Sequence, residues 1–170
     1  MTDFTTALDT NVISAYLNPG DSQHDIAKSN LARVAATTKL CICPVIHAEL
    51  LAAPFSSEAL LDEFLKEYGI AVDWQLEQEI WRLAGRSYRI YASDRKKQQA
   101  PAPRRVIADF LIGAHAVQRG YTLLTLDGRV YSKSFPKLRL ETIAPSSRSR
   151  VWFTSSCHSV REMSGLKPSA

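Results

Sequence analysis

A chain of 170 residues with 45% hydrophobic residues is long enough for one domain with a buried core, and this composition argues against intrinsic disorder. No apolar run approaches the roughly 20 residues that span a membrane, and no basic segment precedes an apolar stretch at the N-terminus, so we expect a cytoplasmic protein without a signal peptide. The formal net charge of +4 is unevenly distributed along the chain. Residues 146–170 hold four basic residues and one acidic residue, and the rest of the chain is only +1. Charge is therefore weak evidence that the body of the protein binds nucleic acid.

Strands and helices are predicted to alternate along the chain. The expected strands cover residues 5–8, 40–43, 69–72, 121–124 and 138–143. The expected helices cover residues 21–37, 57–68, 74–91 and 104–119, with a short apolar helix around Glu49 that begins near Pro44. Ser57 is typical of a helix start and Gly120 of a helix end. Strands separated by helices predict an α/β fold with a parallel sheet.

Two segments interrupt this alternation. Residues 93–103 are polar and contain prolines, which predicts a mobile loop. Beyond Pro145 the chain becomes rich in Ser and Arg and loses its periodicity. We therefore expect one domain over residues 1–145, followed by a flexible basic C-terminal tail over residues 146–170.

The three cysteines do not form a metal-binding pattern. Cys41 and Cys43 are two residues apart in a predicted strand, so their side chains share one face. A zinc site would need further soft ligands at suitable spacing, and Cys157 and the histidines do not supply them. Both strand cysteines are expected to be buried, reduced thiols.

Four acidic residues stand in unusual contexts. Asp9 and Asp127 each follow a predicted strand directly, and Glu49 and Asp109 lie in apolar helices. A carboxylate in an apolar setting is costly unless another group compensates it. Ligand sites of parallel sheets lie at the carboxyl ends of the strands, where Asp9 and Asp127 are expected. If the four acids converge, they form an oxygen-rich site for Mg²⁺ or Mn²⁺ and indicate metal-assisted chemistry on phosphate.

These acids and their surroundings resemble the PIN domain, particularly the VapC-like ribonuclease toxins of prokaryotic toxin–antitoxin pairs. The resemblance covers roughly residues 5–144, and the closing Leu140-Glu141-Thr142-Ile143 is similar to the last strand of the family. The matching pieces occur in order along the chain: Leu8-Asp9-Thr10-Asn11-Val12, Ala48-Glu49-Leu50, Ala108-Asp109-Phe110-Leu111-Ile112-Gly113-Ala114-His115-Ala116 and Thr125-Leu126-Asp127.

The resemblance implies a fold, an activity and a set of partners. The fold is a three-layer α/β arrangement with a central, mostly parallel sheet of about five strands flanked by helices. The activity is that of an endoribonuclease that depends on Mg²⁺ or Mn²⁺. The family is often dimeric, and a small cognate antitoxin inhibits its toxins. The implied metal-site and catalytic residues are Asp9, Glu49, Asp109 and Asp127, and the polar residues that support them are Thr10, Asn11 and Thr125.

The expected reaction is hydrolysis of an RNA phosphodiester bond. In-line attack by a metal-activated water would leave a 5′-phosphate and a 3′-hydroxyl. Several basic side chains could flank the path of the RNA, and an ordinary solvated basic surface is the alternative for them. These side chains are Lys96, Lys97, Arg104, Arg105 and Arg129.

Each acid also has a purely structural interpretation. Asp9 could cap a turn or helix, and Asp127 with Gly128 is a common turn pair. Glu49 could face solvent. Asp109 could pair with Arg105, which lies one helical turn before it.

The aromatic and histidine residues leave similar choices. His47 and His115 could act in acid–base chemistry, although their spacing from the acids favours packed or surface histidines. Trp74 and Trp81 are expected on one helix, where core or dimer packing is favoured over stacking on bases.

Three other classes of function compete with a metal nuclease. A haloacid-dehalogenase-like enzyme usually has a second Asp two residues after the first, and this chain has Asn11 there. A receiver domain needs paired acids near the first strand and a lysine after a late strand, where this chain has Thr125-Leu126-Asp127. A PIN fold kept only for binding RNA or protein is the remaining alternative, and the presence of all four acids disfavours it.

Overall fold

The computed structural model describes residues 4–53, 57–98 and 107–143. Arg104, Arg105 and the predicted tail over residues 146–170 lie outside these ranges, and so does the predicted boundary at residue 145. None of the helices in the described part of the chain is both long and apolar enough to cross a membrane.

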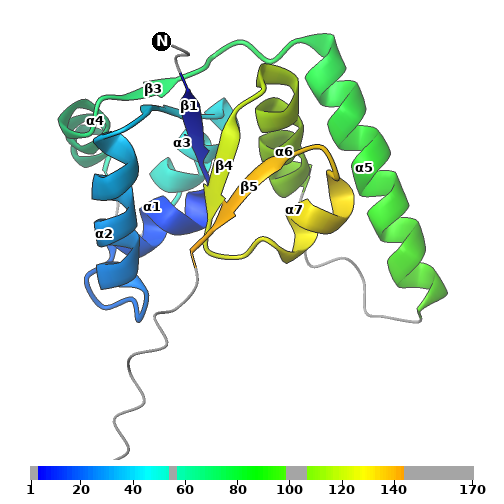
Figure 1. Cartoon of the computed structure of the whole chain (residues 1–170), viewed down its shortest axis with the longest axis horizontal. Helices are drawn as coiled ribbons and strands as arrows, with labels where there is room; N and C mark the ends of the chain where they lie inside the picture. The colour runs from blue at the N-terminus through cyan, green and yellow to red at the C-terminus, as the bar shows by residue number, and fades with distance from the viewer. Residues whose placement is uncertain (1–3, 54–56, 99–106, 144–170) are drawn as a thin grey trace, which may run out of the picture.

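A five-stranded parallel sheet forms the centre of the molecule, in the order β3-β2-β1-β4-β5 (Figure 1). Its strands are β1 (Thr5–Leu8), β2 (Lys39–Ile42), β3 (Ile70–Val72), β4 (Thr122–Thr125) and β5 (Arg139–Thr142). The helices are α1 (Thr10–Leu17), α2 (His24–Ala35), α3 (Pro44–Leu51), α4 (Glu58–Glu67), α5 (Gln78–Lys97), α6 (Ile107–Arg119) and α7 (Arg129–Ser134). The predicted α/β fold with a parallel sheet of about five strands is confirmed.

The direction in which strands are added reverses at β1. The chain first adds β2 and β3 on one side of β1, and then returns through α5 and α6 to place β4 on the other side. In open parallel sheets, ligands bind beyond the carboxyl ends of the strands at such a reversal point. The fold therefore predicts a ligand site at the carboxyl ends of β1 and β4.

Burial explains why the central strands form where they do. Ala7, Leu8, Leu123 and Leu124 are at most 2% exposed, because helices cover the sheet around β1 and β4. Both strands combine buried Leu and Ala side chains with β-branched threonines, which suit a buried parallel strand. Two helix starts that local sequence signals predict are also present in the structure. Pro44 is the first residue of α3, and the hydroxyl of Ser57 caps α4 by accepting a hydrogen bond from the N–H of Leu60 at 3.2 Å.

Several predicted boundaries were wrong. The helix α5 continues to Lys97, so residues 93–97 are helical and not part of a loop, and three basic residues in its last turn suit the negative end of the helix dipole. The same helix begins only at Gln78, so Trp74 precedes it. Asp73 shapes the connecting segment, because its carboxylate accepts a hydrogen bond from the N–H of Gln75.

Two helices were missed altogether. The first is α1, which starts immediately after Asp9 in polar residues that resemble a turn. The second is α7, which is only six residues long and too short to show a helical period. The burial predicted for Cys41 and Cys43 is confirmed, and both are free thiols whose pKa is raised by burial, to about 12 and about 11 respectively.

Candidate functional site

A pocket of about 450 Å³ opens beside the carboxyl end of β1. Three of the four predicted acids line it, and they come from the residue after β1, from α3 and from α6. Its walls are Asp9, Thr10, Asn11, Ser14, Glu49, Ala52 and Asp109. The fold thus brings together carboxylates that lie up to 100 residues apart in the chain.

Asp9 is the most deeply placed of these acids, with only 3% of its surface exposed. Its Oδ2 accepts hydrogen bonds from the hydroxyl of Thr125 at 2.6 Å and from the side-chain amide of Asn11 at 2.8 Å. Burial raises the pKa of Asp9 to about 6, while the hydroxyls of Thr125 and Tyr131 oppose this shift and the nearby carboxylate of Asp109 adds to it. The site therefore holds a carboxylate whose charge is only partly compensated.

Asn11 and Thr125 join the ends of β1 and β4. The Asn11 amide donates to Thr125 Oγ1 at 3.1 Å, and its oxygen accepts from the N–H of Leu126 at 3.0 Å. The N–H of Asp127 donates to Thr125 Oγ1 at 3.1 Å. Thr125 is fully buried, so each of these bonds satisfies a group that water cannot reach. The network fixes the orientation of Asp9.

Glu49 and Asp109 face the same pocket from two different helices. Both are half-buried. The hydroxyl of Thr10 donates to Glu49 Oε2 at 2.6 Å, which ties α3 to the start of α1. Asp109 lies in the first turn of α6, where the helix dipole favours a negative charge. Glu49, for which a solvent-facing position is the alternative, is half-buried and lines the pocket.

Asp127 does not line this pocket. It is engaged by Arg129, whose guanidinium donates to both carboxylate oxygens at 2.9 Å and whose backbone N–H donates to Oδ1 at 3.2 Å. These hydrogen bonds form the turn that leads into α7. The geometry of Asp127 therefore agrees with its interpretation as a turn residue. Arg129 itself remains 89% exposed at its side chain.

The donor atoms of the pocket suit a hard divalent cation. Mg²⁺ is commonly held by one or two carboxylates and keeps several waters. Asp9 and Asp109 are near enough that each disfavours the other's charge, which a cation would relieve. Among residues 4–53, 57–98 and 107–143, no three His, Cys, Asp or Glu side chains are gathered tightly enough to enclose an ion by themselves. The pocket therefore fits a partly hydrated ion and not a protein cage.

The two candidate acid–base histidines lie elsewhere. His115 is fully buried, and its Nε2 lies 3.0 Å from Asp73 Oδ2, which also accepts from Arg119 Nε at 2.7 Å. Burial lowers the pKa of His115, although Asp73 opposes this effect. Burial also pushes the pKa of Asp73 upward, but the hydrogen bonds from His115 and Arg119 outweigh it and the pKa is lowered. The interpretation of His115 as a packed residue is confirmed. His47 packs edge-on against Trp74, with ring centroids 5.1 Å apart.

Other predicted residues are placed as follows. Trp74 and Trp81 are 65% and 53% exposed, so they do not pack in the core, and dimer packing and stacking on bases stay the alternatives for them. Lys96 and Lys97 are exposed at the end of α5. Tyr131 was missed, although it is 1% exposed and its hydroxyl influences Asp9. The sequence contains no local signal for it, because the contact depends on how α7 packs.

Comparisons with known proteins agree with this geometry. The crystal structure of VapBC2 from Rickettsia felis bound to a promoter DNA fragment superposes with a TM-score of 0.59 at 21% identity, covering 83% of this chain and all of that chain. DNA-bound VapBC from Salmonella typhimurium gives a TM-score of 0.56 at 16% identity over 83% of this chain and 99% of that one. FitAcB from Neisseria gonorrhoeae gives 0.53 at 21% identity over 79% and 95%.

At these identities the structural likeness establishes the fold. No curated protein matches the chain. The model of the PIN domain, in contrast, matches residues 6–136, which is most of the chain and includes Asp9, Glu49, Asp109 and Asp127. This chain belongs to the PIN domain family.

Proposed function

We propose that this protein is a metal-dependent endoribonuclease that hydrolyses RNA phosphodiester bonds. The observation that carries the proposal is the pocket at the carboxyl end of β1, where Asp9, Glu49 and Asp109 meet. A structural role alone gives no reason to bury Asp9 next to a second carboxylate at a cost in free energy. A site that binds a cation and a phosphate does give such a reason.

Each residue has a distinct role in this proposal. Asp9 and Asp109 hold Mg²⁺ or Mn²⁺, and Glu49, oriented by Thr10, completes the acidic wall. Asn11 and Thr125 keep Asp9 ionised and aligned. When bound, the cation would offset the negative charge of acids and phosphate and supply an activated water.

The nucleophile in this proposal is water, and no side chain becomes covalently attached to RNA. The P–O3′ bond breaks as water adds to phosphorus, so the products are a 5′-phosphate and a 3′-hydroxyl. Asp127 lies beyond the pocket wall and is assigned the weakest role, that of an acid held by Arg129 at the edge of the site.

We further propose that the protein is the toxin of a toxin–antitoxin pair in the cytoplasm. The solved structures that share its fold include VapBC and FitAB complexes, which supports a cognate antitoxin as partner. A homodimer is part of the same proposal. So is the division into a nuclease domain over residues 1–145 and a basic tail over residues 146–170.

RNA cleavage by the purified full-length chain tests this function. We expect cleavage with Mg²⁺ or Mn²⁺ and none with a chelator. Asp9→Asn and Asp109→Asn should each abolish it, whereas Asp62→Asn, which changes an exposed acid of α4, should leave it intact. Cleavage that persists with a chelator, or at equal rates in all variants, would contradict the proposed site.

A binding module without catalysis is the second candidate. It predicts that the wild-type chain binds RNA or a protein partner without cleaving RNA in any divalent cation. Cleavage that Asp9→Asn removes would exclude it.

A further inference from the structure

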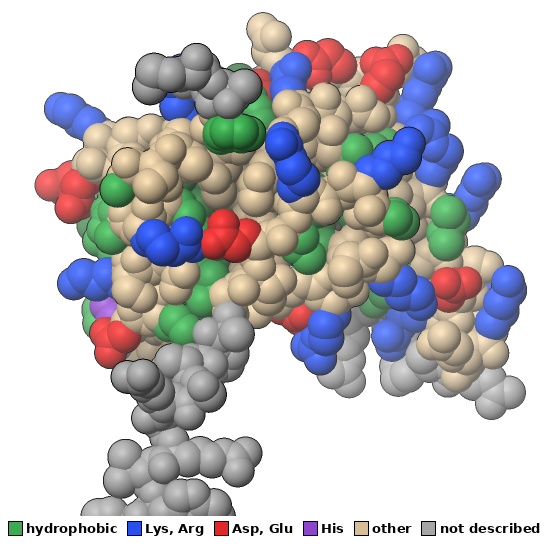
Figure 2. All heavy atoms as spheres, viewed as in Figure 1, with side chains coloured by type: hydrophobic (Ala, Val, Ile, Leu, Met, Phe, Trp, Pro, Cys, Tyr) green, Lys and Arg blue, Asp and Glu red, His purple; other side chains and the backbone are tan. Residues whose placement is uncertain are grey.

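Basic charge is concentrated on one helix. Over its twenty residues α5 holds six basic and two acidic side chains, a net charge of +4. Because residues 1–145 carry only +1 in total, the rest of that body is net acidic. Arg82, Arg86 and Arg89 recur on the exposed face of α5, and none has an acidic partner within the described ranges. Figure 2 shows basic side chains gathered along the side of the molecule that α5 forms.

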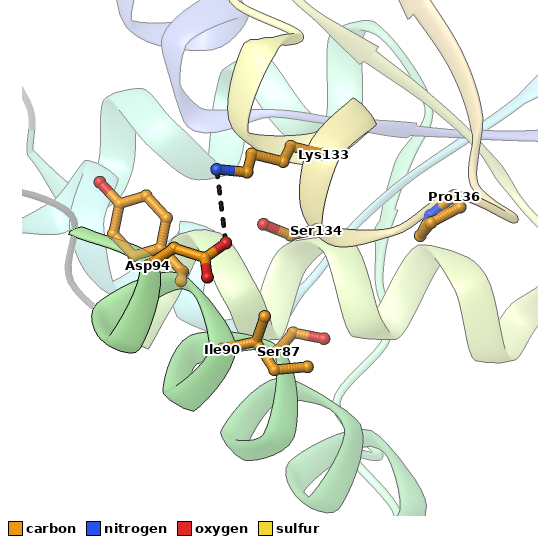
Figure 3. A pocket seen from close by; sticks show the side chains of 7 residues that line it. Ser87, Ile90, Asp94, Lys133, Ser134 and Pro136 are labelled. Carbon is orange, nitrogen blue, oxygen red and sulfur yellow. Dashed lines mark ion pairs between the residues drawn. The ribbon is translucent and has the colours of Figure 1, made fainter. Parts of the chain in front are cut away.

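The same helix forms one wall of a groove whose other wall is α7. Two adjoining hollows of about 190 and 300 Å³ share Ile90 and Asp94. The first reaches across to Lys133 and Ser134 of α7, as Figure 3 shows. Arg89 and Lys97 are among the residues that line the second hollow. Lys133 is thus the cation of the first hollow, Arg89 and Lys97 are the cations of the second, and both hollows share the carboxylate of Asp94.

That carboxylate does not block the groove. Asp94 Oδ2 lies 3.5 Å from Lys133 Nζ, and the two side chains are 37% and 59% exposed. An ion pair this exposed contributes little to stability, so Lys133 can exchange Asp94 for another anion at little cost. The exposed side chain of Ile90, at 62%, offers an apolar surface beside these charges.

The groove adjoins the acidic pocket through two contacts. Tyr131 of α7, two residues before Lys133, contributes to the environment of Asp9. Tyr91, which lines the groove, packs on the ring of Phe110 at 5.4 Å, and Phe110 follows Asp109 directly. Figure 1 shows α7 between the end of β4 and the lower half of α5. The groove therefore lies beside the wall of the pocket, although their linings share no residue.

We propose that the groove between α5 and α7 binds the phosphate backbone of the RNA strand next to the phosphodiester that is cleaved, an assignment that rests on the proposed function. Arg89, Lys97 and Lys133 contact phosphates, and Ile90 packs against a ribose or base. RNA fits better than an acidic protein segment, because the groove lies next to a pocket whose own chemistry concerns phosphate, and because cations spread over α5 and α7 match the regular charges of a nucleic-acid backbone.

The test measures binding of a short, fluorescently labelled single-stranded RNA to the full chain by anisotropy. A chelator is present so that metal-dependent cleavage does not consume the probe. The groove variant is Arg89→Gln with Lys133→Gln. The matched control is Lys28→Gln with Lys66→Gln, which removes the same charge from exposed positions of α2 and α4.

We expect the groove variant to bind RNA about tenfold more weakly, and the slope of log affinity against log salt to fall by about 1.4, since each lost single-strand phosphate contact contributes about 0.7. The control should change affinity less than about twofold, as distant charges are screened. Asp94→Asn should tighten binding, because it removes a negative charge from the groove. A role in folding alone would not produce these opposite signs.

Failure of this inference is distinguishable from failure of the proposed function. If the wild-type chain cleaves RNA with Mg²⁺ or Mn²⁺ but the groove variant and the control bind RNA equally, the groove assignment is overturned and the nuclease stands. If the wild-type chain neither binds nor cleaves RNA, both are overturned. If the groove variant keeps its RNA affinity and loses binding of polyglutamate, the groove takes an acidic protein segment instead.

Discussion

At the scale of single residues, Asp9 carries the clearest conflict between stability and function. Its pKa is raised from 3.8 to about 6, mainly by burial. Between these values the folded state binds the proton that the unfolded state has released, so stability falls as pH rises from about 4 to about 6. The shift corresponds to about 3 kcal/mol at neutral pH in the absence of a cation. The protein retains a charge that its fold disfavours.

Asp9→Asn should therefore stabilise the metal-free protein. The amide removes the buried charge and can still accept the hydrogen bond from Thr125. We expect a gain of about 1–3 kcal/mol in the free energy of unfolding at pH 7 and a smaller gain at pH 5, measured by urea denaturation with a chelator. Asp62→Asn is the control and should change stability little. A loss of stability at pH 7 in the Asp9 variant would contradict the burial argument.

Thr125 is expected to control the charge of Asp9. Thr125→Val keeps the shape of the side chain but removes the 2.6 Å hydrogen bond to Asp9, and it leaves the N–H of Asp127 without its acceptor. The acid side of the pH–activity profile should move to higher pH, and stability should fall by about 1–3 kcal/mol. Thr125→Ser should restore the profile. An unchanged profile in the Val variant would show that the hydroxyl does not act on Asp9.

At the scale of elements, close packing between α6 and α7 explains a glycine inside a helix. A Cβ at Gly113 would collide with the ring of Phe135, so α6 can approach the end of α7 only with glycine there. This approach places Asp109 on one helix and Tyr131 on the other around Asp9. By contrast, a Cβ at Gly85 in α5 would meet nothing within 4 Å.

Two alanine substitutions should therefore have opposite effects. Gly113→Ala forces Phe135 to move and should destabilise the protein by about 1–3 kcal/mol despite the better helix propensity of alanine. Gly85→Ala gains that propensity in open space and should stabilise by about 0.5–1 kcal/mol. Thermal unfolding of both variants tests the pair. Equal and positive shifts in melting temperature would contradict the packing of Phe135 on α6.

At the scale of the whole molecule, the buried residues of the described ranges form one hydrophobic core. The last of its described members is Ile143, which is 5% exposed at the end of β5. A chain truncated after residue 145 should therefore fold with a melting temperature close to that of the full chain and keep metal-dependent cleavage. Its RNA affinity should fall modestly at low salt, because three net positive charges are lost. Loss of cooperative unfolding would show that residues 146–170 belong to the domain.

Much of the fold and part of the site could be predicted from the sequence. Short runs of apolar and β-branched residues at Thr5–Leu8 and Thr122–Thr125 identify buried strands, and Pro44 and Ser57 mark helix starts that the structure contains. Short or polar helices escaped detection because period and composition are uninformative over six to eight residues, as α7 and α1 illustrate. The sequence places Lys96 and Lys97 in a predicted loop because the segment around them is polar and contains prolines, whereas the structure places both at the end of α5.

The sequence by itself determined the strand–helix alternation and the identity and order of the four acids, because periodicity and motifs are properties of short segments. Only the tertiary structure decided which acids meet. Asp9 receives its main hydrogen bond from a residue 116 positions away, and Asp127 turns to Arg129 outside the pocket. It also decided that Lys133 of α7 and the basic residues Arg89 and Lys97 of α5 line adjoining hollows. Burial, proton affinity and charge complementarity depend on neighbours in space, and long-range packing supplies those neighbours.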